Sequence, residues 1–140
     1  MNPINGANYN FLDVGSESSV KKQIFELPGM GQLKGKLFLK QPLNLTGMEV
    51  SINVLPAGVE VPFKHRHKLN EEFYFFIHGQ GEFEVDNERL DIKPGSMIRV
   101  SPQGVRTWRN TGSEDLYYVV VQARANTMDL ATYEDGELVG

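Results

Sequence analysis

Hydrophobic and polar residues alternate with a period of two along much of this chain, which is the pattern of half-buried β-strands. The alternation is clearest in residues 48–55 (MEVSINVL). Residues 116–123 (LYYVVVQA) are almost continuously apolar, which predicts a strand buried on both faces. No segment before residue 125 has helical periodicity over more than a turn or two. Other short strands are expected at residues 23–27, 35–40, 72–78, 82–85, 89–92, 96–100 and 105–110.

Turn-forming residues separate these predicted strands. Asp86 and Asn87 suit a two-residue hairpin turn, because both residue types tolerate positive φ. Residues 93–95 (KPG) fit a type II turn, with proline at its second position and glycine at its third. Roughly eight to ten short strands at such close spacing predict an all-β fold, either an antiparallel sandwich or a barrel, and we favour a jelly roll of two sheets.

The length of 140 residues fits one domain, which would bury roughly two-thirds of its unfolded surface around a single core. We expect the β-barrel at residues 23–125. Residues 1–22 are polar and rich in Asn, Gly and Ser, so an extended or poorly ordered N-terminal segment is expected there. Residues 126–140 form a tail, for which one helical turn, an added strand and a loose end are all compatible with the sequence.

Composition and charge restrict the expected partners. The net charge is −4 and both signs are mixed along the chain, so neither nucleic acid nor an anionic membrane surface is expected to bind. The absence of cysteine rules out disulfides and thiolate metal ligands. No signal peptide or membrane span is recognised, which predicts a cytoplasmic protein.

All three histidines lie in residues 58–79, and two of them are candidates for metal binding. His65 and His67 are two residues apart, so in an extended strand both imidazoles lie on one face. Glu72 follows after four intervening residues. Two imidazoles and a carboxylate suit a divalent transition metal such as Fe, Mn, Ni or Zn, and they would leave coordination positions open. The alternative is a metal-free pair of histidines satisfied by hydrogen bonds.

The neighbouring Glu71 would be the carboxylate ligand if the intervening loop were one residue shorter. Strand alternation groups Glu72 with Tyr74 and Phe76, and we therefore expect Glu72 to face inward and Glu71 outward. The same alternation makes Tyr74 the nearest candidate for a residue that contacts a substrate or acts as a base. No catalytic residue is assigned from the sequence.

The spacing G-x6-H-x-H-x4-E-x6-G from Gly58 to Gly79 resembles the first sequence motif of the cupin superfamily, with one residue more than usual before the first histidine. A second stretch, G-x6-P-x-G from Gly95 followed by R-x3-N from Arg106, resembles the second cupin motif. Together they cover roughly residues 48–122. The resemblance implies a small double-stranded β-helix, the jelly-roll cupin barrel, with a divalent metal held by the two histidines and the glutamate.

In the second motif the family carries a histidine, a fourth metal ligand, where this chain has Arg106. The remaining histidine, His78, is expected at the far end of its strand and would not replace it. If Arg106 points into the barrel, it either pairs with Glu72 in a metal-free site or binds the carboxylate or phosphate of a substrate. Trp108 would then also point inward and form an apolar wall for the ligand. If the register slips, Arg106 points to solvent.

The resemblance implies two main classes of function. One is a metal-dependent enzyme that acts on a small polar or anionic molecule, with dioxygenase, isomerase and decarboxylase chemistry all permitted by the family. The other is a non-catalytic module that binds a sugar, an anion or a metal. A degenerate cupin that serves only association is a third interpretation, which the preserved ligand spacing disfavours.

Aromatic residues occupy both faces of the predicted strand at residues 73–76. The outer face of the barrel should therefore be covered, either by the N-terminal segment or by a second subunit. We expect a homodimer.

Overall fold

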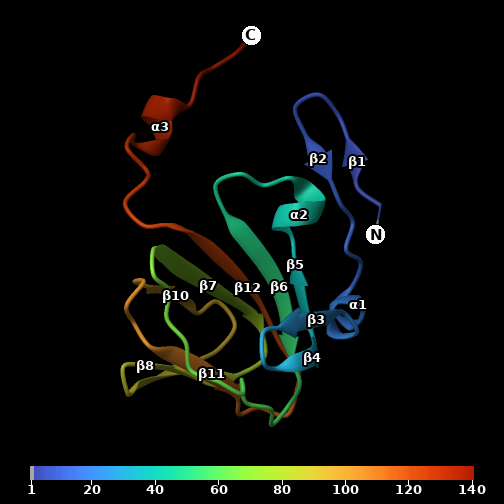
Figure 1. The fold of residues 1–140 in the computed structure, drawn as a ribbon, viewed down its shortest axis with the longest axis vertical. Coiled ribbons are helices and arrows are strands. Elements are labelled where there is room, and N and C mark those ends of the chain that lie inside the picture. Colours follow the sequence, from blue (N-terminus) through green and yellow to red (C-terminus); the bar gives the residue numbers. More distant parts are fainter. Residues whose placement is uncertain (1) are drawn as a thin grey trace.

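Two antiparallel β-sheets form the body of the protein in the computed structural model, which describes residues 2–140 (Figure 1). The strands of the larger sheet are β5 (Lys36–Phe38), β6 (Glu49–Leu55), β7 (Asn70–His78), β10 (Met97–Val100) and β12 (Leu116–Arg124). The strands of the smaller sheet are β8 (Gly81–Val85), β9 (Glu88–Ile92) and β11 (Arg106–Asn110). The strand orders are β10-β7-β12-β6-β5 and β11-β8-β9. The predicted all-β class and jelly-roll barrel are confirmed.

An aromatic core fills the space between the two sheets. Tyr74 and Phe76 of β7 pack against Phe83 of β8 and Trp108 of β11, and all four side chains are buried. The Tyr74 and Phe83 rings meet edge to face with centroids 4.8 Å apart, and Phe83 stacks on Trp108 at 5.6 Å. Aromatic pairs prefer these two arrangements. The core therefore fixes the position of β7 against the smaller sheet.

The strand β12 lies in the centre of the larger sheet, but only one of its faces is fully buried. Leu116, Tyr118 and Val120 are buried in the core, whereas Tyr117 and Val119 on the other face are half-buried. The prediction of two fully buried faces was therefore wrong. The physical reason is that the second face belongs to the outside of the barrel, which is only partly covered.

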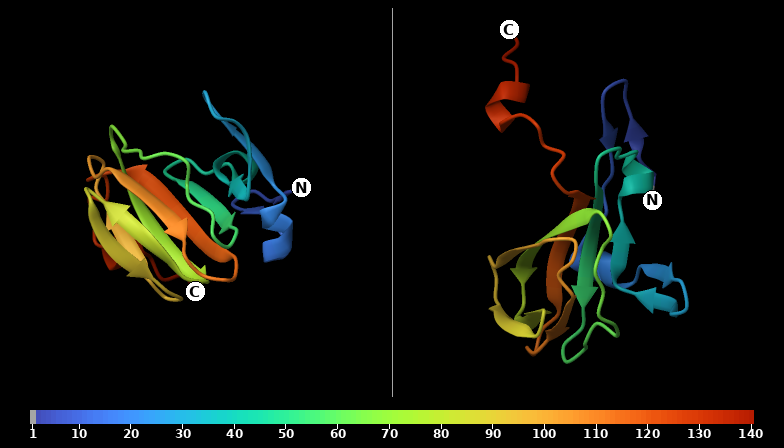
Figure 2. Two further views of the ribbon diagram at one scale, coloured as in Figure 1. Left: turned by 90° about the horizontal axis from the view of Figure 1, so that it is seen from below. Right: turned by 60° about the vertical axis from the view of Figure 1, so that its left-hand side comes forward.

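The N-terminal part is more regular than predicted for residues 1–22, of which residue 1 lies outside the described residues. The two short strands β1 (Ile4–Asn5) and β2 (Asn10–Phe11) pair as a hairpin, and α1 (Glu17–Lys21) packs on β5 and β6. Val20 of α1 is 1% exposed, so the burial of this one apolar side chain positions the helix. A hydrogen bond joins the side chains of Glu17 and His78 at the exposed end of β7. Figure 2 shows this segment beside the barrel.

A second hairpin and two further helices complete the chain. The hairpin consists of β3 (Ile24–Leu27) and β4 (Gly31–Lys34), which pair only with each other. The strand β4 was not predicted, because Leu33 is its only apolar side chain. The short helix α2 (Lys40–Leu43) follows β5. In the tail, α3 (Thr132–Asp135) is the single helical turn that was one of three alternatives, and the tail leads away from the barrel (Figure 1).

Both turns predicted from residue type are present. Asp86 and Asn87 have φ values of 49° and 71° at the turn between β8 and β9. At the second turn, the N–H of Ser96 donates to the carbonyl of Lys93 (2.9 Å), and Gly95 has a φ of 93°. The turn at Asp86 and Asn87 thus sets the register of β8 and β9, and the turn at Gly95 leads from the smaller sheet to the larger one.

None of the helices found between residues 2 and 140 is both long and apolar enough to cross a membrane. On the outer face of β7, Phe73 is 39% exposed. The homodimer, the compartment and the expected lack of nucleic-acid and membrane partners stay predictions.

Candidate metal site and cavity

The segment between β6 and β7 runs along β11 and thereby positions both histidines of the predicted metal site. His65 forms an isolated antiparallel bridge with Arg106, with backbone N···O distances of 3.1 and 2.9 Å. The N–H of His67 donates to the carbonyl of Pro102 (2.9 Å). The histidines therefore lie on an extended segment that pairs with β11 only through isolated bridges. Both imidazoles still lie beside Glu72.

The strand β7 directs Glu72 inward and Glu71 outward. Glu72 is 4% exposed and shares its face with the buried Tyr74 and Phe76. Glu71 accepts a hydrogen bond from the exposed Arg99 (2.9 Å) on the outer face. The structure therefore brings Glu72, and not its neighbour, to the two histidines.

The candidate ligand atoms lie at distances that one metal ion would bridge. The Nε2 atoms of His65 and His67 are each 3.3 Å from Oε1 of Glu72. All three candidate ligand atoms lie within 4.8 Å of one another. Two ligand atoms bound at about 2.1 Å to one ion, at tetrahedral or octahedral angles, are separated by about 3.0–3.4 Å. The arrangement therefore fits a shared divalent metal.

The protonation states also suit metal binding. Burial lowers the pKa of the His67 imidazole, and the nearby Glu72 carboxylate opposes this shift only in part. Burial alone would raise the pKa of Glu72, but hydrogen bonds with His65 and Tyr74 lower it to about 2. The Tyr74 hydroxyl makes this bond by donating to Oε1 (2.6 Å). At neutral pH the site thus offers an ionised carboxylate and the neutral imidazole of His67, which are the metal-binding forms.

Arg106 points into the barrel and lies beside Glu72. Its side chain is 0% exposed, and its Nε is 3.5 Å from Oε1 of Glu72. Its Nη2 donates to the carbonyl of Ser101 (3.4 Å), whereas its Nε and Nη1 have no hydrogen-bond partner among the described residues. The outward orientation considered from the sequence is thus wrong. Trp108 also points into the barrel, as predicted, and is 5% exposed.

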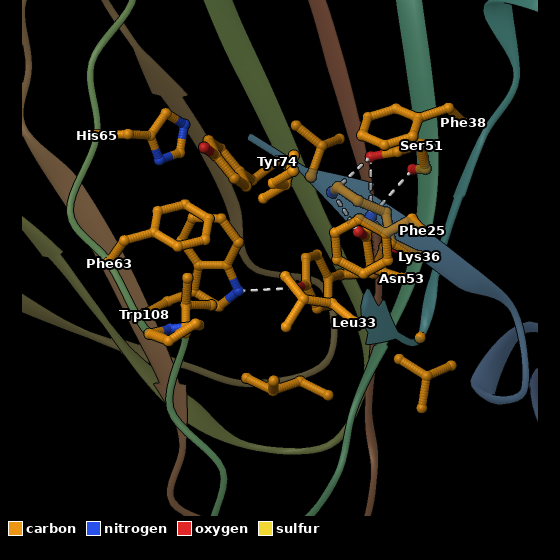
Figure 3. Close-up of a pocket in the computed structure, with 18 of the residues that line it drawn as sticks. Phe25, Leu33, Lys36, Phe38, Ser51, Asn53, Phe63, His65, Tyr74 and Trp108 are labelled. Carbon is orange, nitrogen blue, oxygen red and sulfur yellow. Dashed lines mark hydrogen bonds between the residues drawn. The ribbon is translucent and has the colours of Figure 1, made fainter. Parts of the chain in front are cut away.

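A cavity of about 680 Å³ lies between the sheets in front of the candidate metal site (Figure 3). Its wall includes the three candidate ligands together with Tyr74 and Trp108. The indole N–H of Trp108 donates to the Tyr118 hydroxyl (2.8 Å), which fixes the ring as a flat surface. Arg106 is not among the described residues that line this cavity. Its predicted contact with a substrate stays a prediction, as do those of Tyr74 and Trp108.

The structure adds to the cavity a charged residue that sequence reasoning missed. Lys36 of β5 lies on the cavity wall, and its Nζ donates to Oγ of Ser51 (3.2 Å) and Oδ1 of Asn53 (2.5 Å). The strand register pairs Lys36 with Asn53 and Phe38 with Ser51, so all four side chains share the inner face. The available signal was the matching alternation of polar residues in these two segments.

Residues 51–122 match the family model described as the cupin domain, so this chain belongs to the cupin family, as the sequence motifs indicated. A curated relative is 5-nitrosalicylic acid 1,2-dioxygenase from Bradyrhizobium sp, 32% identical over 94 residues, which are 66% of this chain and 41% of that protein. The uncharacterized protein MJ1618 from Methanocaldococcus jannaschii is 30% identical over 63 residues, 45% of this chain and 50% of that protein. This chain thus spans half or less of the length of these two relatives.

Solved structures support the same fold along nearly the whole chain. A cupin protein from Bacteroides fragilis superposes with a TM-score of 0.80 at 30% identity, covering 96% of this chain and 99% of that one. A predicted oxalate decarboxylase from Thermotoga maritima superposes with a TM-score of 0.62 at 22% identity, covering 78% of this chain and 96% of that one. The second likeness concerns the fold alone.

Proposed function

We propose that this chain is a metal-dependent enzyme that acts on a small anionic molecule. In this proposal His65, His67 and Glu72 hold a divalent transition metal at the wall of the cavity. The observation that carries it is the approach of both histidine Nε2 atoms to one carboxylate oxygen at 3.3 Å. The His65 contact is also a long hydrogen bond, and a separation of 3.3 Å suits two ligands of one ion.

An unpaired buried nitrogen supports the fit of a metal to these residues. Nε2 of His67 is buried and has no hydrogen-bond partner among the described residues, although it lies near Glu72. Buried polar atoms are nearly always paired, so this atom calls for a partner, and a cation would be one. The Arg106 guanidinium partly neutralises the Glu72 carboxylate. We therefore expect a lower metal affinity than that of a site with four protein ligands.

The residues around the site would have distinct tasks. A bound metal would supply Lewis acidity or, if it is iron, activation of dioxygen. Tyr74 holds the Glu72 carboxylate in place through its hydrogen bond, which is the usual task of a residue behind a metal ligand. Trp108 offers an apolar wall to the substrate. The relative whose name gives 5-nitrosalicylic acid as its substrate supports a small aromatic acid here too.

Elemental analysis tests the proposal. Untagged protein is purified without chelator and compared with the His65→Ala/His67→Ala double variant, before and after reconstitution with Fe(II), Mn, Ni and Zn. We expect a near-stoichiometric transition metal in the parent and its loss in the double variant. His78→Ala is the matched control, because this exposed histidine pairs with Glu17 away from the site and should leave the metal content unchanged. A parent that takes up none of the four metals contradicts the proposal.

A binding module without catalysis is the second candidate, and the contact between Arg106 and Glu72 favours it. The guanidinium occupies the place of the family's fourth ligand and neutralises the only carboxylate of the site. The two candidates differ in turnover. The enzyme consumes a small acid when loaded with metal, whereas the binding module takes up the acid and returns it unchanged.

A further inference from the structure

Lys36 brings a positive charge to the cavity wall without an acidic partner. No ion pair joins its Nζ to any Asp or Glu within residues 2–140. Burial lowers its pKa to about 8, and the negative charges of Glu72 and Glu49 oppose this shift only in part. Lys36 is half-buried, and a cation removed from water without a counter-ion weakens the folded state, so its presence in a cavity has to be explained.

The surroundings of Lys36 hold its ammonium group in place and leave one donor free. An ammonium group has three N–H donors, and two of them reach Ser51 and Asn53. The amide of Asn53 donates in turn to the carbonyls of Ser51 (3.2 Å) and Tyr118 (3.3 Å), which directs its Oδ1 toward Lys36. The ammonium also lies 5.2 Å from the centre of the Phe38 ring. The third donor is therefore available to a ligand.

Lys36 and the candidate metal ligands line the same cavity, so one ligand could contact both. Two strands, β6 and β12, separate β5 from β7, and the register places Lys36 across the sheet from Phe76, with Glu72 four residues away along β7. Both side chains reach into the cavity and shorten this gap. Figure 3 shows Lys36 with Ser51 and Asn53 on one side and His65 on the other, with Tyr74 between them.

The wall between these two polar ends is aromatic and aliphatic. Phe38, Phe63, Trp108 and Tyr118 line it. Such a wall suits a flat apolar body, and the cation at one end suits a carboxylate. Arg106 is not among the described residues on the cavity surface, whereas Lys36 is.

We propose that Lys36, Ser51 and Asn53 form a subsite that binds the carboxylate of a small aromatic acid, whose opposite end faces His65, His67 and Glu72. The inference rests on the proposed function in that it takes the same cavity as the ligand site. The subsite itself needs no metal, because its donors belong to β5 and β6 and none of them is a candidate ligand.

Binding of benzoate and of its neutral counterpart benzamide tests the subsite. Trp108 is the only tryptophan and lines the cavity, so its fluorescence reports binding without any turnover. We expect the parent to prefer benzoate, and Lys36→Met to weaken benzoate binding by about tenfold or more, since a charged hydrogen bond is lost. Lys36→Arg should keep the preference. Lys34→Met, which removes another lysine that lines the cavity, should change it by less than about twofold.

Three results would overturn the subsite: no benzoate binding by the parent, equal binding of benzoate and benzamide, or equal benzoate binding by the parent and a folded Lys36→Met variant. If that variant does not fold, the ¹⁵N resonance of the Lys36 ammonium in the parent decides. It should move with benzoate and not with benzamide. The metal-free His65→Ala/His67→Ala variant should still prefer benzoate. A failure of metal uptake would thus contradict the proposed enzyme and leave the subsite standing. Metal uptake without a preference for benzoate would contradict the subsite and leave the metal site standing.

Discussion

One oxygen atom, Oε1 of Glu72, is approached by four other side chains. His65 and His67 lie 3.3 Å from it, Tyr74 donates to it at 2.6 Å, and Arg106 lies 3.5 Å away. A metal ion and the Arg106 guanidinium would therefore both interact with the negative charge of the Glu72 carboxylate. At the residue scale, an arginine at the motif position of the fourth ligand would change the charge balance of the candidate site as well as its number of ligands.

The buried pair of Arg106 and Glu72 makes a prediction about stability. Arg106→Met should lower the free energy of unfolding by about 3–5 kcal/mol, because it leaves the Glu72 charge buried without its cationic partner. Urea unfolding at pH 7 measures this change. Arg99→Met is the matched control, since Arg99 is exposed and pairs with Glu71 on the surface, and it should cost at most about 1 kcal/mol. Equal losses in the two variants would contradict the prediction.

Lys36 makes a prediction about the pH dependence of stability. Its pKa is about 8 in the folded protein and about 10.5 when unfolded, so between these values the unfolded state binds more protons. Stability should therefore rise as pH increases from about 8 toward 10. Lys34 at the cavity wall and the carboxylates of Glu49 and Glu72 are the charged groups around it.

Urea unfolding across this pH range measures the rise in the parent and in Lys36→Met, where it should be absent. The raised pKa values of Tyr74 and Tyr118 lower stability only above about pH 10, and they do so in both proteins. Parallel stability curves for the two proteins would show that Lys36 is not the responsible group.

At the scale of elements, most strands could be predicted from the sequence. Which face of a strand points into the barrel could be predicted only in part. The alternation in β6 was recognised, yet it does not reveal that its polar residues face inward. Ser51 and Asn53 are only 4% and 2% exposed. They line the cavity and accept hydrogen bonds from Lys36 there. Lys36 was missed for the same reason, since a lysine in an alternating strand is normally on the solvent side. The histidines and Glu72 were found because their spacing is tied to one family motif.

The turn between β7 and β8 makes a prediction that separates backbone strain from crowding. Gly79 and Gly95 both have a φ near +90°. A Cβ at Gly79 would lie 2.6 Å from the carbonyl oxygen of Asp115 and 2.9 Å from Cα of Leu116, whereas a Cβ at Gly95 would meet nothing within 4 Å. Gly95→Ala should cost about 1–2 kcal/mol from the left-handed conformation alone.

Gly79→Ala should cost about 1–3 kcal/mol more than this, because backbone atoms have to move. The free energy of unfolding of the two variants, measured side by side, gives the difference directly. If Gly79→Ala were no less stable than Gly95→Ala, the close approach of the β7–β8 turn to the start of β12 would not constrain the fold.

At the scale of the whole molecule, the barrel could be predicted and its additions could not. The close spacing of strands and turns was sufficient for a jelly roll. The helix α1 has five residues, too few for a periodic pattern, and it is positioned by the burial of Val20. In the hairpin of β3 and β4 only β3 was predicted, and three of its apolar side chains, Phe25, Leu27 and Leu33, line the cavity. Long-range packing of this kind leaves no local pattern in the sequence.

The strand β5 precedes residue 51, where the match to the family begins. The candidate metal ligands lie inside the matched segment, whereas Lys36 and the cavity residues of β3 and β4 lie outside it. Of the three proposed subsite residues, Lys36 alone precedes the match, whereas Ser51 and Asn53 lie at its start. A substitution of Lys36 alone would therefore change the charge of the cavity wall while the three candidate metal ligands stay the same. Homologues that share the motif should accordingly be compared first by what they carry at the position of Lys36.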